Sequence, residues 1–108
     1  MADLVFGEKD NGALVQVPRG SKVTIELPEN PMTGHQWAID SIDEVFLVPE
    51  GDAFLIGQQM GLGPGGVRRF YFRVKGPGCT SLSFINKRRL ETGTAAANTF
   101  KLAVRIVK

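Results

Sequence analysis

The side chains with the most reactive chemistry in this chain are Cys79 and His35, its one thiol and its one imidazole. A thiol and an imidazole act together as nucleophile and base only when they lie within hydrogen-bond reach. Cys79 follows Gly78 at the start of a strand pattern, which indicates a small core or edge residue. His35 lies at the base of a loop at the far end of the predicted fold. We therefore predict no catalytic residue, and the chain is not expected to be an enzyme.

Metal and nucleotide chemistry is also not indicated. Zinc and calcium sites need several ligands at regular spacing, whereas the acidic residues here are dispersed, as at Asp40, Asp43 and Glu44. The glycine-rich stretch 57–66 lacks the Lys-Ser/Thr pair of a phosphate-binding loop, and a strand pattern follows it where such a loop leads into a helix. We therefore predict no metal and no cofactor.

Three segments are unusual enough to suggest a binding role. The first, residues 28–35, is longer than a tight hairpin requires and contains two prolines. Proline restricts φ to about −65°, so Pro31 stiffens the segment. Gly34 permits the positive φ with which the chain would turn back into the next strand. The segment is predicted to be a preshaped projection with Met32 and Thr33 at its tip.

The other two segments differ from the first in chemistry. Residues 57–66 contain five glycines and no charged side chain. Backbone of this kind can approach another surface closely. Residues 86–93, with the sequence NKRRLETG, form a basic turn before the last strand. A solvated hairpin explains this third segment as well as a binding role does.

Alternation of apolar and polar residues dominates the rest of the chain and is clearest over residues 22–27. It predicts half-buried strands. No helical periodicity persists, and turn residues such as those at 49–51 separate the strands. Many short strands predict an all-β, immunoglobulin-like antiparallel β-sandwich of seven to eight strands. The predicted strands are residues 4–6, 13–17, 22–27, 36–39, 53–56, 67–74, 80–85 and 99–107.

The predicted sandwich has consequences for the core and for the three segments. Trp37 is expected to open a central strand and to pack in the core, across from Leu82 or Phe84. Connections after the second, fourth and sixth core strands of such a sandwich emerge at one end. The three segments would therefore form one composite surface. Rigid loops on a rigid scaffold lose little entropy on docking, which favours protein binding over catalysis.

Length and composition limit the alternatives. The chain has 108 residues, of which 43% are hydrophobic and 22% charged, so residues 1–108 are expected to form a single immunoglobulin-like domain. The net charge is only +2, and the 13 basic and 11 acidic side chains are too evenly balanced to form a nucleic-acid-binding face. With one cysteine no internal disulfide is possible. We expect no nucleic-acid partner.

No apolar run approaches the roughly 20 residues that cross a bilayer, and no signal peptide is visible. We expect no membrane partner, and a cytoplasmic, vesicular or mature secreted location is compatible with the sequence. A monomer is expected, because edge strands carrying Lys101, Arg105 and Lys108 would discourage pairing between sheets of two molecules.

The three segments resemble the loops of the chagasin family, inhibitors of papain-like cysteine peptidases, and the resemblance runs along nearly the whole chain. That family carries Asn-Pro-Thr-Thr-Gly, Gly-x-Gly-Gly and Arg-Pro-Trp/Phe loops on an immunoglobulin-like sandwich without disulfides. The third loop departs from the family pattern, since it offers arginine but neither the proline nor the aromatic. The peptidase-binding residues that the resemblance implies are Asn30, Pro31, Met32, Thr33 and Gly34 in the first loop, Gly63, Pro64, Gly65 and Gly66 in the second, and Arg88, Arg89 and Leu90 in the third.

The resemblance implies a reversible, tight-binding inhibitor of papain-like, cathepsin L-type cysteine peptidases. The first loop would cover the catalytic cysteine and histidine, and the other two would grip the walls of the cleft. Met32 stands in place of the family's first threonine, Leu90 is a candidate for the missing apolar contact, and the residue that replaces the aromatic is left open. Our hypothesis is a reduced or altered target preference. The alternative is an immunoglobulin-like adhesion or carbohydrate-binding module. Sugar sites usually display exposed aromatic side chains, and the three segments contain none.

Overall fold

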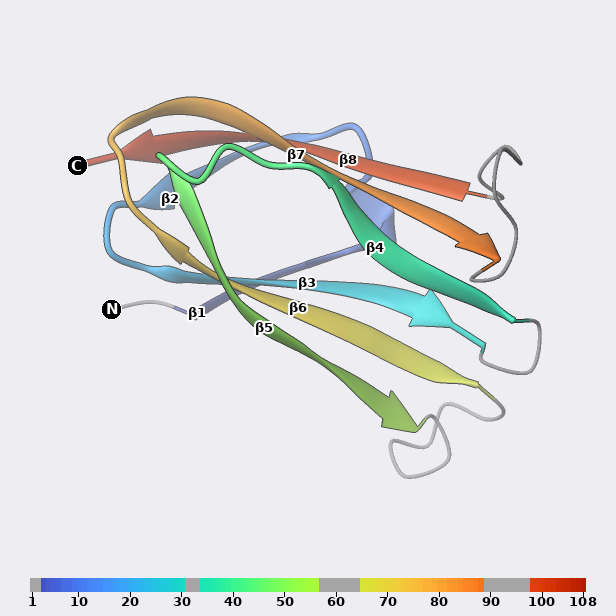
Figure 1. Ribbon diagram of the computed structural model, residues 1–108. Helices are drawn as coiled ribbons and strands as arrows, with labels where there is room; N and C mark the ends of the chain where they lie inside the picture. Colours follow the sequence, from blue (N-terminus) through green and yellow to red (C-terminus); the bar gives the residue numbers. More distant parts are fainter. Residues whose placement is uncertain (1–2, 31–33, 57–64, 89–97) are drawn as a thin grey trace.

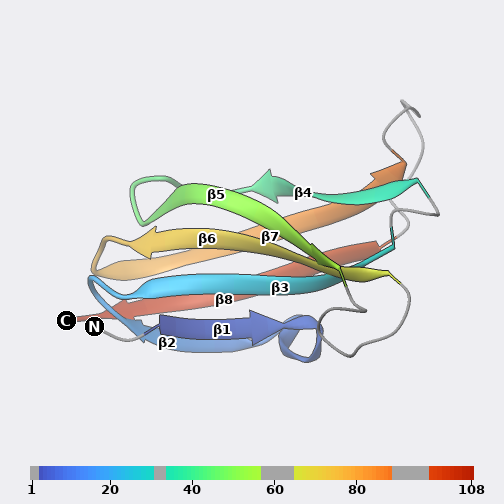
Figure 2. The same cartoon turned by 90° about the horizontal axis from the view of Figure 1, so that it is seen from below.

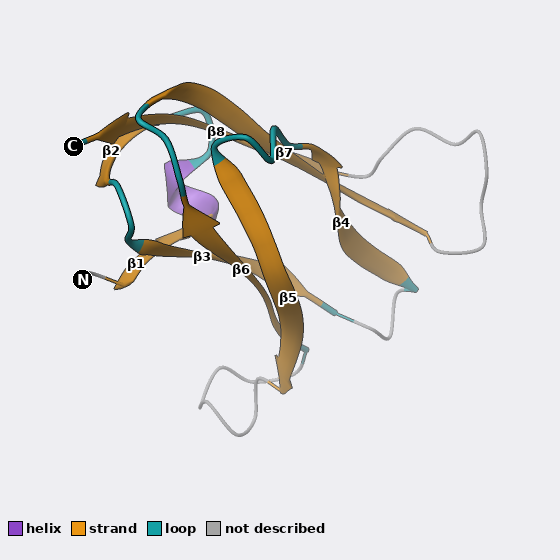
Figure 3. Cartoon of the chain, turned by 60° about the vertical axis from the view of Figure 1, so that its left-hand side comes forward, coloured by secondary structure: helices purple, strands orange, loops and turns teal. Residues whose placement is uncertain are grey.

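The computed structural model describes residues 3–30, 34–56, 65–88 and 98–108. Strands account for most of them, as the alternation predicts, and a short 3-10 turn, η1 (Glu8–Asp10), follows the first strand (Figure 3). No helix among the described residues is long and apolar enough to cross a membrane. The strands are β1 (Asp3–Gly7), β2 (Leu14–Pro18), β3 (Lys22–Glu29), β4 (His35–Ser41), β5 (Leu47–Ile56), β6 (Gly66–Val74), β7 (Gly78–Arg88) and β8 (Asn98–Val107).

The strands form two packed sheets (Figure 2). Sheet A has the order β1-β3-β6-β5, and sheet B has the order β2-β8-β7-β4. The immunoglobulin-like sandwich is thus confirmed, but both sheets are mixed, because β1 pairs with β3 and β2 with β8 in parallel. Alternation reports which face of a strand is buried and carries no information on strand direction, so these two parallel pairs could not be predicted from it.

The core lies between the sheets and centres on Phe84 of β7. Its ring lies 4.7 Å from that of Phe70, 6.2 Å from that of Phe72 and 5.9 Å from that of Phe100, measured between centroids. The first two rings belong to sheet A and the third to sheet B. Burying each such side chain contributes about 1.5–3 kcal/mol, so this cluster holds the two sheets together.

Two expectations about single strands are wrong. Residues 49–51 do not separate two strands, because β5 continues through them and its register with β6 shifts between Pro49 and Asp52. β5 is an edge strand, where a proline and a bulge are tolerated. Trp37 is buried as predicted, but β4 is also an edge strand and Trp37 pairs with Asn86.

The basic residues expected to protect an edge strand, Lys101 and Arg105, do not lie on an edge. Lys101 and Arg105 lie on β8, which sits between β2 and β7 and is therefore not an edge. Their charges cannot protect an edge from pairing with another molecule. The edge strands of the described sandwich are β1 and β5 in sheet A and β2 and β4 in sheet B.

Candidate functional site

Strand register brings the bases of the three predicted loops to one end of the sandwich. In sheet A, Gly66 of β6 pairs with Glu29 on one side and with Ile56 on the other. In sheet B, His35 pairs with Arg88. These strand ends lie together at the right of Figure 1. We call them the loop-bearing end, and they adjoin the connections β3–β4, β5–β6 and β7–β8.

Only part of the predicted site lies in the described residues. Asn30, Gly34, Gly65 and Gly66 are at the loop-bearing end. Arg88 is the last residue of β7 and pairs with His35 through its strand position, so the third connection begins after it, three residues later than the predicted segment 86–93. The predicted site residues that fall outside the described residues are Pro31, Met32, Thr33, Gly63, Pro64, Arg89 and Leu90.

Two glycines at the loop-bearing end have backbone conformations that favour glycine. Gly34 has φ of 79°, which confirms the predicted turn back into β4, and Gly65 has φ of 84°. A Cβ added to Gly65 would lie 3.4 Å from the carbonyl oxygen of Glu29 and 3.5 Å from Cβ of Asn30. The end of the second connection therefore packs against the start of the first.

A buried carboxylate lies at the junction of these two connections. Glu29, the last residue of β3, is only 6% exposed. Its Oε1 accepts a hydrogen bond of 2.8 Å from the backbone N–H of Trp37, and its Oε2 accepts one of 2.9 Å from Nε of Arg68. Burying an ionised carboxylate is costly unless it is paired and hydrogen-bonded, and both oxygens here have partners.

Trp37 joins the two sheets at the same place. Its indole Nε1 donates a hydrogen bond of 2.7 Å to the carbonyl oxygen of Pro28. Together with the bond from its backbone N–H to Glu29, this ties β4 of sheet B to β3 of sheet A. The two strands that carry the first connection are therefore fixed relative to each other just below it.

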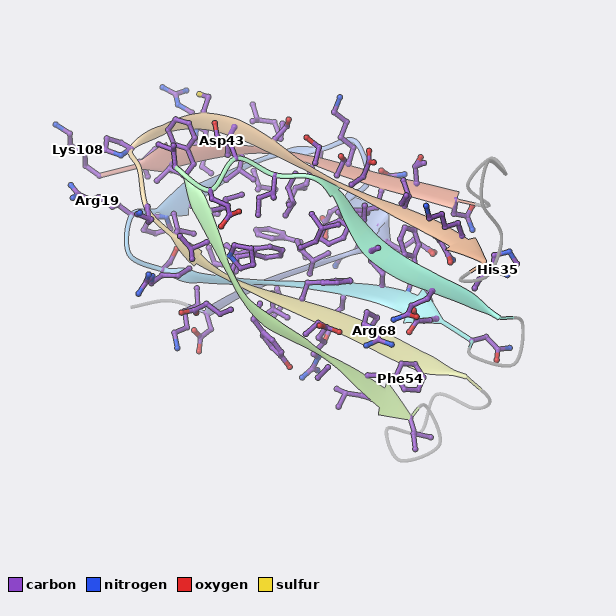
Figure 4. The ribbon with its side chains drawn as sticks, viewed as in Figure 1. Arg19, His35, Asp43, Phe54, Arg68 and Lys108 are labelled. Atoms are coloured by element: carbon purple, nitrogen blue, oxygen red, sulfur yellow. The ribbon has the colours of Figure 1, made fainter. Side chains whose placement is uncertain are left out.

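Arg68 extends the contacts to the second connection. Its Nη1 donates a hydrogen bond of 2.8 Å to Oδ2 of Asp52, and its guanidinium carbon lies 5.4 Å from the centroid of the Phe54 ring. Figure 4 shows Arg68 and Phe54 side by side on β6 and β5. From β6, the strand after the second connection, one guanidinium thus contacts β5, the strand before that connection, and β3, the strand before the first connection.

Sequence reasoning overlooked Glu29 and Arg68, although the pattern contained a signal for both. The inward positions of β3 are Val23, Ile25 and Leu27, and continuing that alternation places Glu29 inward. The same rule places Arg68 inward, two residues before the buried Phe70. Opposite charges at inward positions of two adjacent strands predict a buried ion pair.

The thiol and the imidazole lie at opposite ends of the sandwich. Cys79, near the start of β7, is exposed, so it is not a core residue. His35 pairs with Arg88 at the other end of β7, and a strand rise of about 3.3 Å per residue puts roughly 30 Å between the two positions. The described residues also contain no group of three or more potential metal ligands.

A family model described as the chagasin family of peptidase inhibitors, I42, matches residues 16–104. Its members are inhibitors, which confirms the prediction that the chain is not an enzyme. The structure is similar to that of EhICP2, a cysteine protease inhibitor from Entamoeba histolytica, with a TM-score of 0.84 and 19% identity over 97% of this chain and 95% of that one.

Two further solved structures share the fold. The solution structure of amebosin has a TM-score of 0.79 and 23% identity, over 99% of this chain and 100% of that one. PbICP-C, in complex with falcipain-2, has a TM-score of 0.56 and 17% identity, over 98% of this chain and 90% of that one. No curated protein sequence matches significantly. The family match over most of its length shows that the chain belongs to the chagasin family of peptidase inhibitors.

Proposed function

We propose that the protein is a reversible, tight-binding inhibitor of papain-like, cathepsin L-type cysteine peptidases. It acts as a monomeric inhibitor domain over residues 1–108 and occludes the active-site cleft with the three connections of the loop-bearing end. The observation that carries the proposal is the register that gathers the bases of these connections, with Glu29 opposite Gly66 and His35 opposite Arg88. Family membership supports a peptidase as the partner, as does the complex of PbICP-C with falcipain-2.

Each connection has its own part in the proposed mechanism. The first, with Asn30 to Gly34, enters the cleft and covers the peptidase's cysteine and histidine. The second, with Gly63 to Gly66, lies against one wall of the cleft, where glycine backbone allows close approach. The third, with Arg89 and Leu90 and with Arg88 at its base, lies against the other wall.

Rigidity explains how such a loop blocks a peptidase without being digested. Proteolysis requires a carbonyl carbon held in line with the attacking thiolate. Pro31 restricts the backbone before the tip, and the positive φ of Gly34, 79°, fixes the turn after it. The hydrogen bonds of Trp37 to Glu29 and Pro28 hold the base. A loop restrained in this way keeps its peptide bonds out of the reactive orientation.

The exposure of aromatic side chains favours inhibition over the carbohydrate-binding alternative. The chain has nine aromatic residues, of which seven are Phe, and all of them fall in the described residues. None is among the exposed large hydrophobic side chains, which are Val5, Leu14, Val45 and Ile56. A sugar-binding platform needs a well-exposed ring, whereas the least buried aromatic residues of the described surface, Phe6, Phe46, Phe54 and Tyr71, are half-buried.

The test is a titration of papain and of a cathepsin L-type peptidase with the purified protein, read with a fluorogenic peptide. The proposal expects stoichiometric loss of activity, recovery on dilution, and an intact inhibitor chain on a denaturing gel. Full peptidase activity at micromolar excess of the protein would reject the proposal and favour the adhesion or carbohydrate-binding alternative. Cleavage of the chain with transient inhibition would identify it as a substrate.

A further inference from the structure

The first and second connections share one buried anchor. Glu29 ends β3 and so precedes the first connection directly, while Arg68 lies two residues into β6, just after the second. Their side chains form an ion pair with an Nε–Oε2 distance of 2.9 Å, and they are only 3% and 16% exposed. The pair is therefore part of the support beneath both connections and too deeply buried to serve mainly as a contact surface.

Through their hydrogen bonds, the two anchor residues, Glu29 and Arg68, link all four strands that carry the two connections. Glu29 accepts the backbone N–H of Trp37 on β4, where the first connection ends. Arg68 donates to Asp52 on β5, which leads into the second connection. Gly65 also packs against the backbone of Glu29. Any change in the Glu29–Arg68 distance would therefore shift the first connection relative to the second.

We infer that Glu29 and Arg68 are positioning residues that set the spacing between the first and second loops for peptidase binding. The inference rests on the proposed function and adds to it a pair that touches no peptidase. If only a fraction of molecules holds both loops at the right spacing, the apparent association constant is the intrinsic one multiplied by that fraction. The loss then appears mainly in the association rate, whereas losing a direct contact raises the dissociation rate.

A second ion pair on the same two strands provides a matched control. Arg69 bonds Glu26 through its Nε, one residue further along β6. Glu26 and Arg69 are directly paired in the register of β3 and β6, and both side chains are about a third exposed. This pair has the same chemistry and lies on the outer face of sheet A, away from the anchor.

The experiment compares conservative variants of the two pairs. Glu29→Gln keeps an oxygen for the Trp37 N–H but removes the charge that faces Arg68. Arg68→Lys keeps a cation but loses the planar fork that binds Glu29 and Asp52 together. Their controls are Glu26→Gln and Arg69→Lys. For all four, thermal unfolding is measured beside association and dissociation rates with papain, well below each melting temperature.

The inference expects Glu29→Gln and Arg68→Lys to slow association on the order of tenfold, because preorganisation is lost. The dissociation rate should change little, and the effect should persist at high salt. The controls should stay within about twofold of wild type, as expected for exposed pairs. Association rates of the anchor variants equal to those of their controls would overturn the inference while leaving the proposed function intact.

Two safeguards keep the result interpretable. If Glu29→Gln or Arg68→Lys does not fold, Asp52→Asn tests the same anchor, because Asp52 has 48% side-chain exposure and the substitution removes only the charge that faces Arg68 from β5. Association slowed at least about threefold by Asp52→Asn would support the inference, and a wild-type rate would overturn it. Wild-type protein that fails to inhibit papain would reject the proposed function itself, and the positioning role with it.

Discussion

The backbone N–H of Trp37 donates a hydrogen bond of 2.8 Å to Oε1 of Glu29, and this bond crosses from sheet B to sheet A. Backbone donors of edge strands are otherwise free to meet solvent or another chain. Here the donor is used to close the sandwich at the base of the first connection. The same residue donates its indole N–H to Pro28, so one tryptophan supplies two bonds between the sheets.

The indole bond gives the first prediction. Trp37→Phe keeps an aromatic ring in the core but leaves the Pro28 carbonyl without its partner and removes part of the ring. We expect the free energy of unfolding to fall by about 2–4 kcal/mol, from the lost hydrogen bond and the lost volume together. Urea denaturation measures it. Unfolding energy within about 0.5 kcal/mol of wild type, the range of a surface substitution, would show that the bond between Trp37 and Pro28 contributes nothing.

The close approach of Gly65 to the first connection gives the second prediction. Gly65→Ala places a methyl group at a residue with φ of 84°, 3.4 Å from the Glu29 carbonyl oxygen. Gly12→Ala is the matched control, because its φ is 83° and nothing lies within 4 Å of the added atom. Both should destabilise the fold by about 1 kcal/mol through backbone strain. Only Gly65→Ala should also weaken papain inhibition, and equal inhibition by the two variants would contradict the role of this contact.

The fold was predictable because β3, β6 and β8 alternate between buried and more exposed residues. Val23, Ile25 and Leu27 all face the core, and the same period runs through β6 and β8. Turn residues then predict where the strands end. The same residue types also occur in bulges inside a strand, as Pro49 and Gly51 show. Whether a Pro-Gly stretch ends a strand depends on the register with its neighbour, which is a long-range property.

The site was predictable in part, for a related reason. Loop motifs are local, so Gly34 could be given its positive φ from the sequence alone. The anchor depends on β3 and β6 being neighbours, and nothing local pairs Glu29 with Arg68 across 39 positions. Only the topology, with β3 beside β6, turns two separate inward charges into an ion pair.

The tip of the first loop gives the third prediction. Thr33→Ala removes one hydroxyl from a residue in the first connection, outside the described strands. We expect inhibition of papain to weaken by about 1 kcal/mol or more, the usual effect of losing one interfacial hydrogen bond. Thermal stability should be nearly unchanged. Residual peptidase activity and a melting curve measured on the same sample test this, and a parallel loss of both would identify Thr33 as a structural residue.

The charge of the third loop gives the fourth prediction. Replacing Arg88 and Arg89 together with Ala should slow association with the peptidase, and the difference from wild type should shrink at high salt, because salt screens electrostatic steering. The double variant Lys101→Ala and Arg105→Ala is the control, since it removes the same charge from exposed positions on β8. Stopped-flow measurements at low and high salt give the association rates of the two double variants. Identical rates would mean that the arginines of the third loop do not contribute to binding.

The departure of the third loop from the family pattern gives the fifth prediction. We propose that Leu90 supplies the apolar contact that the family obtains from an aromatic residue, and large aromatics are among the strongest interface anchors, with losses of about 2 kcal/mol or more on truncation. Leu90→Trp should therefore tighten binding to papain by about tenfold or more, mainly through slower dissociation. Leu14→Trp is the control, because Leu14 is 66% exposed on β2 and the substitution adds the same ring outside the loops. Equal affinity for wild type and Leu90→Trp would mean that the third loop approaches the cleft through its arginines, and that the aromatic position of the family has no counterpart here.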